Sequence, residues 1–288
     1  MRSIAVAAAL LLGSLALQGC GITQQANFRR TDTVIKTHVP AAPVHVDVAN
    51  GSIEVKAGEA DEVLITAEIK ALTQERLDQT MLVVTRAPDQ TLDISVQWPN
   101  DKRKNNEGCS VTITMPNAST VALKSSNGRL TVTGIGTDLN LHTSNGRLIA
   151  SHIPGNIYGR TSNGRVILTD IGGEIDVDTS NGKLILTDIA GPVRAETSNG
   201  AVQVRMTDSA SGPIDINTSN GSATIAVGPG FQGQLQLNTS NGRIKVDEQT
   251  DAKSRTMNKS SARIDFGGNN SSRVHTSNGS ITVTTLEE

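Results

Sequence analysis

Three stretches of the chain carry nearly the same sequence. Residues 143–150 read Thr-Ser-Asn-Gly-Arg-Leu-Ile-Ala, residues 161–168 read Thr-Ser-Asn-Gly-Arg-Val-Ile-Leu, and residues 179–186 read Thr-Ser-Asn-Gly-Lys-Leu-Ile-Leu. The Asn-Gly pair recurs every 18 residues from Asn127 to Asn199, and intervals of 21, 21 and 37 residues follow. A fixed period of this length indicates a repeat architecture. The repeated asparagines are Asn127, Asn145, Asn163, Asn181, Asn199, Asn220, Asn241 and Asn278.

Within one unit, residues 163–180, apolar and polar side chains alternate on both sides of Gly172-Gly173. Period-two alternation predicts strands with one buried face, so each unit reads as strand, turn, strand, turn. We therefore predict an all-β fold, a single-stranded β-helix (β-solenoid) with rungs of about 18 residues. The Asn corners would stack as a ladder of side-chain amides, with Thr and Ser hydroxyls stacking beside them. Glycine in the corner is expected to supply a positive φ.

Two other architectures compete with the solenoid. Asn-Gly between alternating strands is also a hairpin signal, but a meander of hairpins would not keep a constant spacing. A left-handed hexapeptide helix also has 18 residues per coil. Counting in sixes from Val166 reaches Gly172 and Asp178, so no aliphatic hexad exists and the acyltransferase function of that fold is rejected.

The flanking segments follow the same pattern less regularly. Residues 41–120 are predicted to be a divergent N-terminal part of the solenoid, and residues 121–286 the regular part, with a polar insertion at 247–262 that forms a surface loop. Thr73 would cap a short helix over residues 73–79. The run Asp-Lys-Arg-Lys-Asn-Asn-Glu at residues 101–107 is expected to be a solvated loop.

The N-terminus has the layout of a secretory signal. Arg2 precedes an apolar run from Ile4 to Leu17, which is too short to favour a spanning helix. The tetrad Leu17-Gln18-Gly19-Cys20 resembles a bacterial lipobox, which implies a signal peptide at 1–19 and lipidation of Cys20. A polar tether over residues 20–40 would follow, and Gly21 implies transfer to the outer membrane by the same resemblance. We expect a lipid-anchored protein on the periplasmic side or the surface of the outer membrane; the alternative is a secreted or soluble periplasmic protein.

Composition and motifs argue against several functions. The net charge of −2 does not suggest nucleic-acid binding. No nucleophile elbow, P-loop or zinc signature occurs, so we predict no catalytic residues, no cofactor and no metal. Cys109 is expected to be an isolated thiol unless it pairs with Cys20. A polysaccharide-cleaving enzyme is the alternative, because Asp170 with Asp188, and Asp178 with Glu196, would stack as carboxylate pairs.

A basic position follows the Asn-Gly pair in most units. If the next residue faces inward, this position faces outward and forms a ladder of positive charge. It would bind phosphate or carboxylate groups of an envelope polysaccharide. The alternative is that these side chains are solvated and screened by Asp176, Asp178 and Glu196. The ladder residues are Arg129, Arg147, Arg165, Lys183 and, after Ala201 and Ser222 interrupt it, Arg243.

The chain resembles the bacterial putative-adhesin domain family of unknown function, the four-zero-nine-seven DUF family. The matching features are residues 44–55, the run Val-Thr-Ile-Thr-Met-Pro at 111–116, and the serial Ser-Asn-Gly units from Ser126. The resemblance implies a β-helical fold and no catalytic residues. We therefore expect a non-catalytic envelope lipoprotein that acts as an adhesin-like binding or structural module. The alternative is a regulatory or scaffolding partner in envelope stress, acting through another envelope protein.

Overall fold

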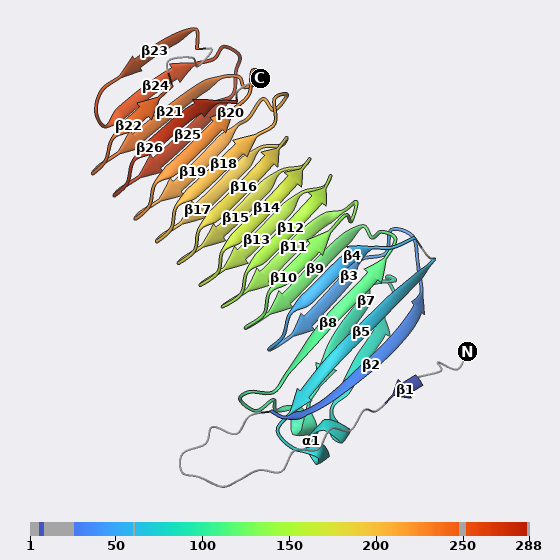
Figure 1. The fold of residues 1–288 in the computed structure, drawn as a ribbon. Helices are drawn as coiled ribbons and strands as arrows, with labels where there is room; N and C mark the ends of the chain where they lie inside the picture. The colour runs from blue at the N-terminus through green and yellow to red at the C-terminus, as the bar shows by residue number, and fades with distance from the viewer. Residues whose placement is uncertain (1–5, 9–25, 60, 248–251, 287–288) are drawn as a thin grey trace, which may run out of the picture.

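The computed structural model describes residues 6–8, 26–59, 61–247 and 252–286. Two sheets of thirteen strands each run along an elongated molecule, with the termini at opposite ends (Figure 1). Each regular rung gives one strand to each sheet, and neighbouring strands are parallel. This is the predicted β-solenoid, and the parallel pairing excludes a meander of hairpins. Sheet A contains β10 (Leu130–Thr133), β12 (Leu148–Ile153), β14 (Val166–Ile171), β16 (Leu184–Ile189), β18 (Val202–Met206) and β20 (Ala223–Val227).

Sheet B takes the other strand of each rung. It contains β9 (Thr120–Ser125), β11 (Asp138–Thr143), β13 (Ile157–Thr161), β15 (Ile175–Thr179), β17 (Val193–Thr197) and β19 (Ile214–Thr218). Residues 18 apart pair directly in β11 to β17, for example Ile157 with Ile175 and Ile175 with Val193. Identical spacing therefore places equivalent side chains above one another, and Ile, Val and Leu fill the narrow interior between the sheets.

A backbone irregularity in sheet A explains why the buried positions do not alternate strictly. His152, Asp170 and Asp188 have φ values of 57°, 57° and 56°, and Gly134 has 71° at the equivalent position. One residue in left-handed conformation lets the next one, Ile153, Ile171 or Ile189, return to the core. Asp is among the residues that tolerate this conformation best after Gly.

The N-terminal rung does not lie at the end of the stack. It consists of β3 (Val44–Val48) and β4 (Ile53–Ala57). β4 pairs with β8 (Gly108–Met115) on one side and β10 on the other, and β3 lies between β7 (Leu92–Gln97) and β9. The rung is thus inserted between two segments that come later in the chain. Residues 41–120 do form irregular terminal rungs, but the order of stacking differs from the order of the sequence.

Antiparallel strands close the N-terminal end. β5 (Glu62–Ala71) pairs with β8, β2 (Phe28–Thr37) pairs with β5, and β1 (Val6–Ala8) pairs with β2, while β6 (Met81–Arg86) pairs with β7. The predicted tether over 20–40 is therefore wrong for residues 28–37, whose Thr, Val and Ile favour a strand. The rest of that segment up to residue 25 lies outside the described residues.

A short helix and a buried ion pair cover this end of the core. α1 (Gln74–Gln79) has the predicted cap, because the Thr73 hydroxyl accepts a hydrogen bond from the Arg76 backbone N–H. Arg76 Nε and Nη2 donate to the two carboxylate oxygens of Glu107 at 2.6 and 2.7 Å. Glu107 is 1% exposed, so the prediction that residues 101–107 are a solvated loop is wrong at its last residue. The short 3-10 turn η1 (Pro99–Asp101) precedes this loop.

The C-terminal end repeats the insertion. The last rung, β25 (Ser271–Thr276) and β26 (Ile281–Thr285), lies between β19–β20 and the rung formed by β21 (Gln234–Thr239) and β22 (Ile244–Val246). A hairpin of β23 (Ser254–Met257) and β24 (Ser261–Asp265) then extends sheet B antiparallel to β21. The predicted surface loop at 247–262 is therefore an ordered hairpin in its described part, with Ala262 and Ile264 buried.

Candidate functional site

The Asn corners form a continuous chain of side-chain hydrogen bonds. Asn145 Nδ2 donates to Asn127 Oδ1 at 2.8 Å, and Asn163 and Asn181 repeat the contact at 2.9 Å. Asn50 joins the ladder as the acceptor of Asn127, 77 residues away. The inserted rung changes the order at the other end, where Asn278 donates to Asn220 and Asn241 donates to Asn278. The corners are therefore structural, and they stack in the order of the rungs.

The Thr of each corner points inward. Thr161 is 6% exposed, and its hydroxyl donates to the Gly146 carbonyl oxygen at 3.1 Å. Thr143 and Thr179 make the same bond to the glycine of the neighbouring rung. The Thr hydroxyls thus bind backbone and do not stack on one another, and they satisfy a carbonyl that would otherwise be buried without a partner.

The corner glycines are required for a different reason than the sequence suggested. None of the glycines in the Asn-Gly pairs has a positive φ. A Cβ on Gly164 would lie 1.7 Å from the Gly146 carbonyl oxygen, and a Cβ on Gly146 would lie 1.8 Å from that of Gly128. Close approach of consecutive rungs, rather than backbone conformation, excludes every larger residue here.

The predicted basic residues form a column on the outer edge of sheet A. Arg129, Arg147 and Arg165 are exposed, and Lys183 is half-buried on the next rung. Since rungs are about 4.8 Å apart, these four cations are stacked at close range. Within the described ranges, none of the four makes an ion pair with an acidic side chain. We call Arg129, Arg147, Arg165 and Lys183 the basic column.

Arg243 does not belong to this column. Ala201, Ser222 and Ser280 occupy the equivalent positions on the three rungs between Lys183 and Arg243, because the last rung is inserted there. The prediction that only Ala201 and Ser222 separate Arg243 from the ladder is therefore wrong, because Ser280 also lies between them. The sequence does not show this, since it does not contain the order in which the terminal rungs are stacked.

Sheet B presents a different surface on the same rungs. Arg160 Nη2 lies 2.9 Å from Asp176 Oδ2, and Arg194 contacts Asp176, Glu196 and Asp215. Hydrogen bonding to Asp176 raises the pKa of Arg160, although burial opposes the shift. The acids that were expected to screen the basic column, Asp176, Asp178 and Glu196, thus lie on the opposite sheet, where arginines pair with Asp176 and Glu196.

The two carboxylate columns considered for catalysis lie apart. Asp170 and Asp188 are at the far edge of sheet A, and Asp188 Oδ1 accepts from Arg205 Nη1 at 2.8 Å. Asp178 and Glu196 are neighbours on sheet B, and Glu196 pairs with Arg194. The two pairs therefore do not converge on one site. In the described part of the chain, no group of three or more His, Cys, Asp or Glu side chains is placed to hold a metal ion.

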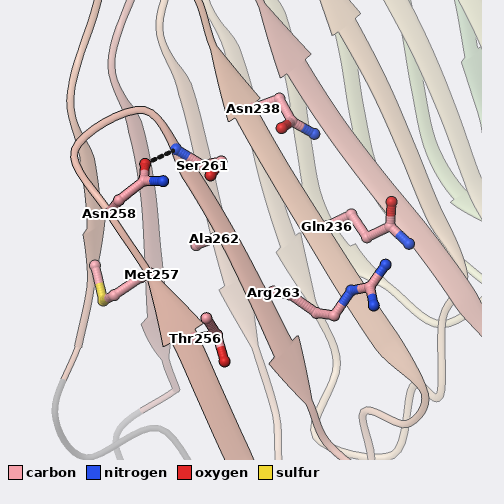
Figure 2. A pocket seen from close by; sticks show the side chains of 8 residues that line it. All are labelled: Gln236, Asn238, Thr256, Met257, Asn258, Ser261, Ala262 and Arg263. Carbon is pink, nitrogen blue, oxygen red and sulfur yellow. Dashed lines mark hydrogen bonds between the residues drawn. The ribbon is translucent and has the colours of Figure 1, made fainter.

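A shallow pocket of about 430 Å³ lies on the C-terminal hairpin, away from the basic column. Its side chains, drawn in Figure 2, come from β21, β23 and β24 and from the turn between β23 and β24. Sequence reasoning missed these residues, and the only signal for them was the break in the repeat between Asn241 and Asn278. Six of its eight lining residues are polar, and the full set is Gln236, Asn238, Thr256, Met257, Asn258, Ser261, Ala262 and Arg263.

Of the two cysteines, only Cys109 lies among the described residues. Cys20 lies outside the described residues, so its lipidation stays a prediction. Cys109 is a free thiol buried in the core, and burial raises its pKa to about 12. It is therefore inert as a nucleophile at neutral pH. Among the described segments, no helix has the length and hydrophobicity of a membrane span.

The two long parallel sheets and the stacked columns of equivalent residues place this protein in the class of β-solenoid repeat proteins. The chain belongs to the Toastrack DUF4097 family, whose model matches residues 43–284. The resemblance drawn from the Ser-Asn-Gly units is thereby confirmed.

Several solved structures match most of the chain at low sequence identity and low TM-scores. One is a putative adhesin from Bacteroides fragilis, at 13% identity and a TM-score of 0.49, covering 92% of this chain and 100% of that one. Another is a putative lipid binding protein from Parabacteroides distasonis, at 12% identity and a TM-score of 0.43, covering 91% and 98%. A third, a putative cell adhesion protein from Clostridium sporogenes, has 10% identity and a TM-score of 0.30, covering 89% and 100%. The chain matches no curated protein sequence.

Proposed function

We propose that this chain is a non-catalytic, adhesin-like binding module of the cell envelope, held to the membrane by a lipid on Cys20. The signal-like segment before Cys20 supports the anchor. The stacked rungs make a stiff rod, since each rung is fixed to its neighbours by the strand ladder and the corner bonds. In this arrangement the solenoid displays its outer faces to envelope polymers.

The basic column is the observation that carries the proposal. Four cations on consecutive rungs have no acidic partner among the described residues, whereas Arg160 and Arg194 on sheet B of the same part of the rod are paired. Guanidinium groups form strong, charge-assisted hydrogen bonds with phosphates and carboxylates. A linear array of them suits a polymer that carries repeated anionic groups, such as lipopolysaccharide.

The test is charge reversal in the column. We expect the full chain to bind purified lipopolysaccharide in a sedimentation assay, and the Arg129→Glu/Arg147→Glu/Arg165→Glu variant to bind at least ten-fold more weakly. Lys124→Glu is the control, because Lys124 is an exposed cation on sheet B that pairs with Asp47. Unchanged binding by the triple variant would refute the role of the column.

The anchor and the absence of catalysis are tested separately. Labelled palmitate should be incorporated into the wild type in a bacterial host and lost in Cys20→Ala. Incubation of the purified protein with envelope polysaccharides should release no fragments. Turnover of any of these polymers would contradict the non-catalytic assignment.

A further inference from the structure

The C-terminal end of the rod carries cations on the outer face of sheet B. The hairpin contributes Arg263, and the neighbouring strand β25 contributes Arg273. Acidic residues precede the hairpin at 247, 248 and 251 and follow β26 at 287 and 288, so the positive charge belongs to these two strands and not to the whole end of the rod. The basic column lies several rungs away.

These two cations flank a polar row on the outer face of sheet B. Gln236 on β21 pairs with Arg273 on β25 and with Arg263 on β24. In the next row, Asn238 lies between His275 and Ser261. Both arginines are exposed. The pocket opens over these rows, and Figure 2 shows the Arg263 guanidinium and the Gln236 amide extending on the same side of the strands.

The pocket side chains retain unused hydrogen-bonding capacity. Gln236, Asn238, Thr256 and Arg263 make no side-chain hydrogen bond or ion pair to any part of the chain that the structure describes. Asn258 is fixed, since its Oδ1 accepts from the Ser260 and Ser261 backbone N–H groups at 2.9 and 2.8 Å. The Asn258 turn therefore holds the rim, while amide, hydroxyl and guanidinium groups remain available to a ligand.

We propose that this pocket binds an acidic sugar residue. The guanidinium of Arg263 would hold the carboxylate in a charge-assisted contact. The amides of Gln236 and Asn238 and the hydroxyl of Thr256 would bind ring hydroxyls, since amides both donate and accept. The volume of about 430 Å³ falls within the range of small-molecule sites, roughly 300–1,000 Å³.

The position of the pocket suits a contact with material away from the cell. It lies at the end of the rod opposite β2 and the N-terminus (Figure 1). A ligand there would meet the tip of the rod, whereas the basic column faces sideways. The two sites are therefore independent, and either can fail without the other.

The test uses trigalacturonate as the acidic probe, maltotriose as the neutral probe and the full chain in titration calorimetry. We expect trigalacturonate to bind and maltotriose to bind at least ten-fold more weakly. Arg263→Gln should weaken trigalacturonate binding at least ten-fold. Asn238→Asp should also weaken it, because a carboxylate in the pocket repels the probe. Thermal melts of both variants should match the wild type, since both side chains are exposed.

Arg147→Gln is the matched control, an exposed arginine of the basic column that should leave trigalacturonate binding within two-fold of the wild type. Absence of binding to the wild type, or equal binding by Arg263→Gln, would overturn the proposal. Equal affinity for maltotriose would overturn the acidic class of ligand. Loss of lipopolysaccharide binding in the Arg129, Arg147 and Arg165 charge reversal bears only on the basic column.

Discussion

The outer faces of sheets A and B are built by the same rungs, yet they place charge differently. On sheet B, Arg194 lies between Asp176 and Asp215 on the neighbouring strands, and Arg160 pairs with Asp176, although Asp178 and Glu196 are stacked on one another. On sheet A, four cations are stacked on one another. In the rungs that carry the basic column, the acids of sheet A are at the far end of the strands: Arg165 and Asp170 are five residues apart, roughly 16 Å along a strand. That exceeds the screening length of physiological salt, about 8 Å. Glu54 on the neighbouring strand β4 lies diagonal to Arg129 and makes no ion pair with it.

This difference between the two sheets shows that the stacked cations of sheet A are compatible with the fold but are not required by it. Like charges directly opposite one another in a sheet are destabilising. Folding alone therefore gives no reason for four successive cations, and the repeat would accept Thr or Gln at these exposed positions. Ala201 and Ser222 occupy the equivalent positions of the following rungs, and the strands that begin directly after them stay paired there, Leu184 with Val202 and Val202 with Ala223. A surface that opposes stability is a reasonable place to look for binding.

Arg76 and Glu107 form the most buried ion pair among the described residues, and breaking it should have the largest effect on stability. Glu107→Gln should destabilise the fold by about 3–5 kcal/mol, because it leaves the Arg76 charge without its buried partner. Chemical unfolding measures this loss. Glu68→Gln, which removes the exposed partner of Arg29, should cost about 0–1 kcal/mol. Equal losses in the two variants would contradict the role of burial.

The same pair should give the stability a dependence on pH. Burial alone would raise the pKa of Glu107, but hydrogen bonds from Arg76 and from the backbone of Lys104 and Leu72 lower it below its ordinary value of 4.5. The contribution is therefore complete above pH 4.5 and is lost as the pH falls through the lowered pKa. Glu107→Gln should lack this acid-side loss.

The corner holds both faces in register, so its disruption should affect them together. Gly164→Ala should destabilise the fold by about 3 kcal/mol, because the added Cβ meets the Gly146 carbonyl oxygen and forces the rungs apart. Gly136→Ala is the matched control, since its Cβ would lie 3.9 Å from Pro154 Cγ in ordinary contact. Comparable losses in denaturant unfolding would show that the close approach at the corner is unimportant.

The amide ladder should contribute less than the corner glycine. Asn163→Ala removes one bond donated to Asn145 and one accepted from Asn181. At roughly 0.5–1.5 kcal/mol for each hydrogen bond, the expected loss is about 1–3 kcal/mol. Asn140→Ala, an exposed asparagine of β11 outside the ladder, should change the unfolding free energy by less than about 0.5 kcal/mol.

The regular middle of the fold could be predicted because its signal is local. Each unit repeats the same alternation, and the constant 18-residue interval places Asn145 over Asn127 without further information. The ends could not be predicted in this way. The rung at 271–285 has the same Thr-Ser-Asn-Gly corner as its neighbours, so nothing in its sequence shows that it inserts before the rung of Asn241.

Other predictions were wrong for physical reasons that differ from residue to residue. Asn-Gly is compatible with positive φ, and only the distance between rungs shows that the missing Cβ is what matters. Glu107 ends a charged run, and its burial depends on Arg76, 31 residues earlier. The pocket around Arg263 forms only when the hairpin pairs with β21, a long-range contact that local patterns do not contain.

The central claim is that the basic column is kept for binding in spite of its effect on stability. The most direct measurement is the unfolding free energy of Arg129→Gln/Arg147→Gln/Arg165→Gln at low salt, beside its affinity for lipopolysaccharide, with Arg194→Gln as the sheet B control. We predict that the triple variant is more stable than the wild type by a few tenths of a kcal/mol or more, that salt removes the gain, and that binding falls at least ten-fold. Arg194→Gln should lose stability and keep its binding. A triple variant that is less stable than the wild type, or that binds lipopolysaccharide equally well, would contradict the claim.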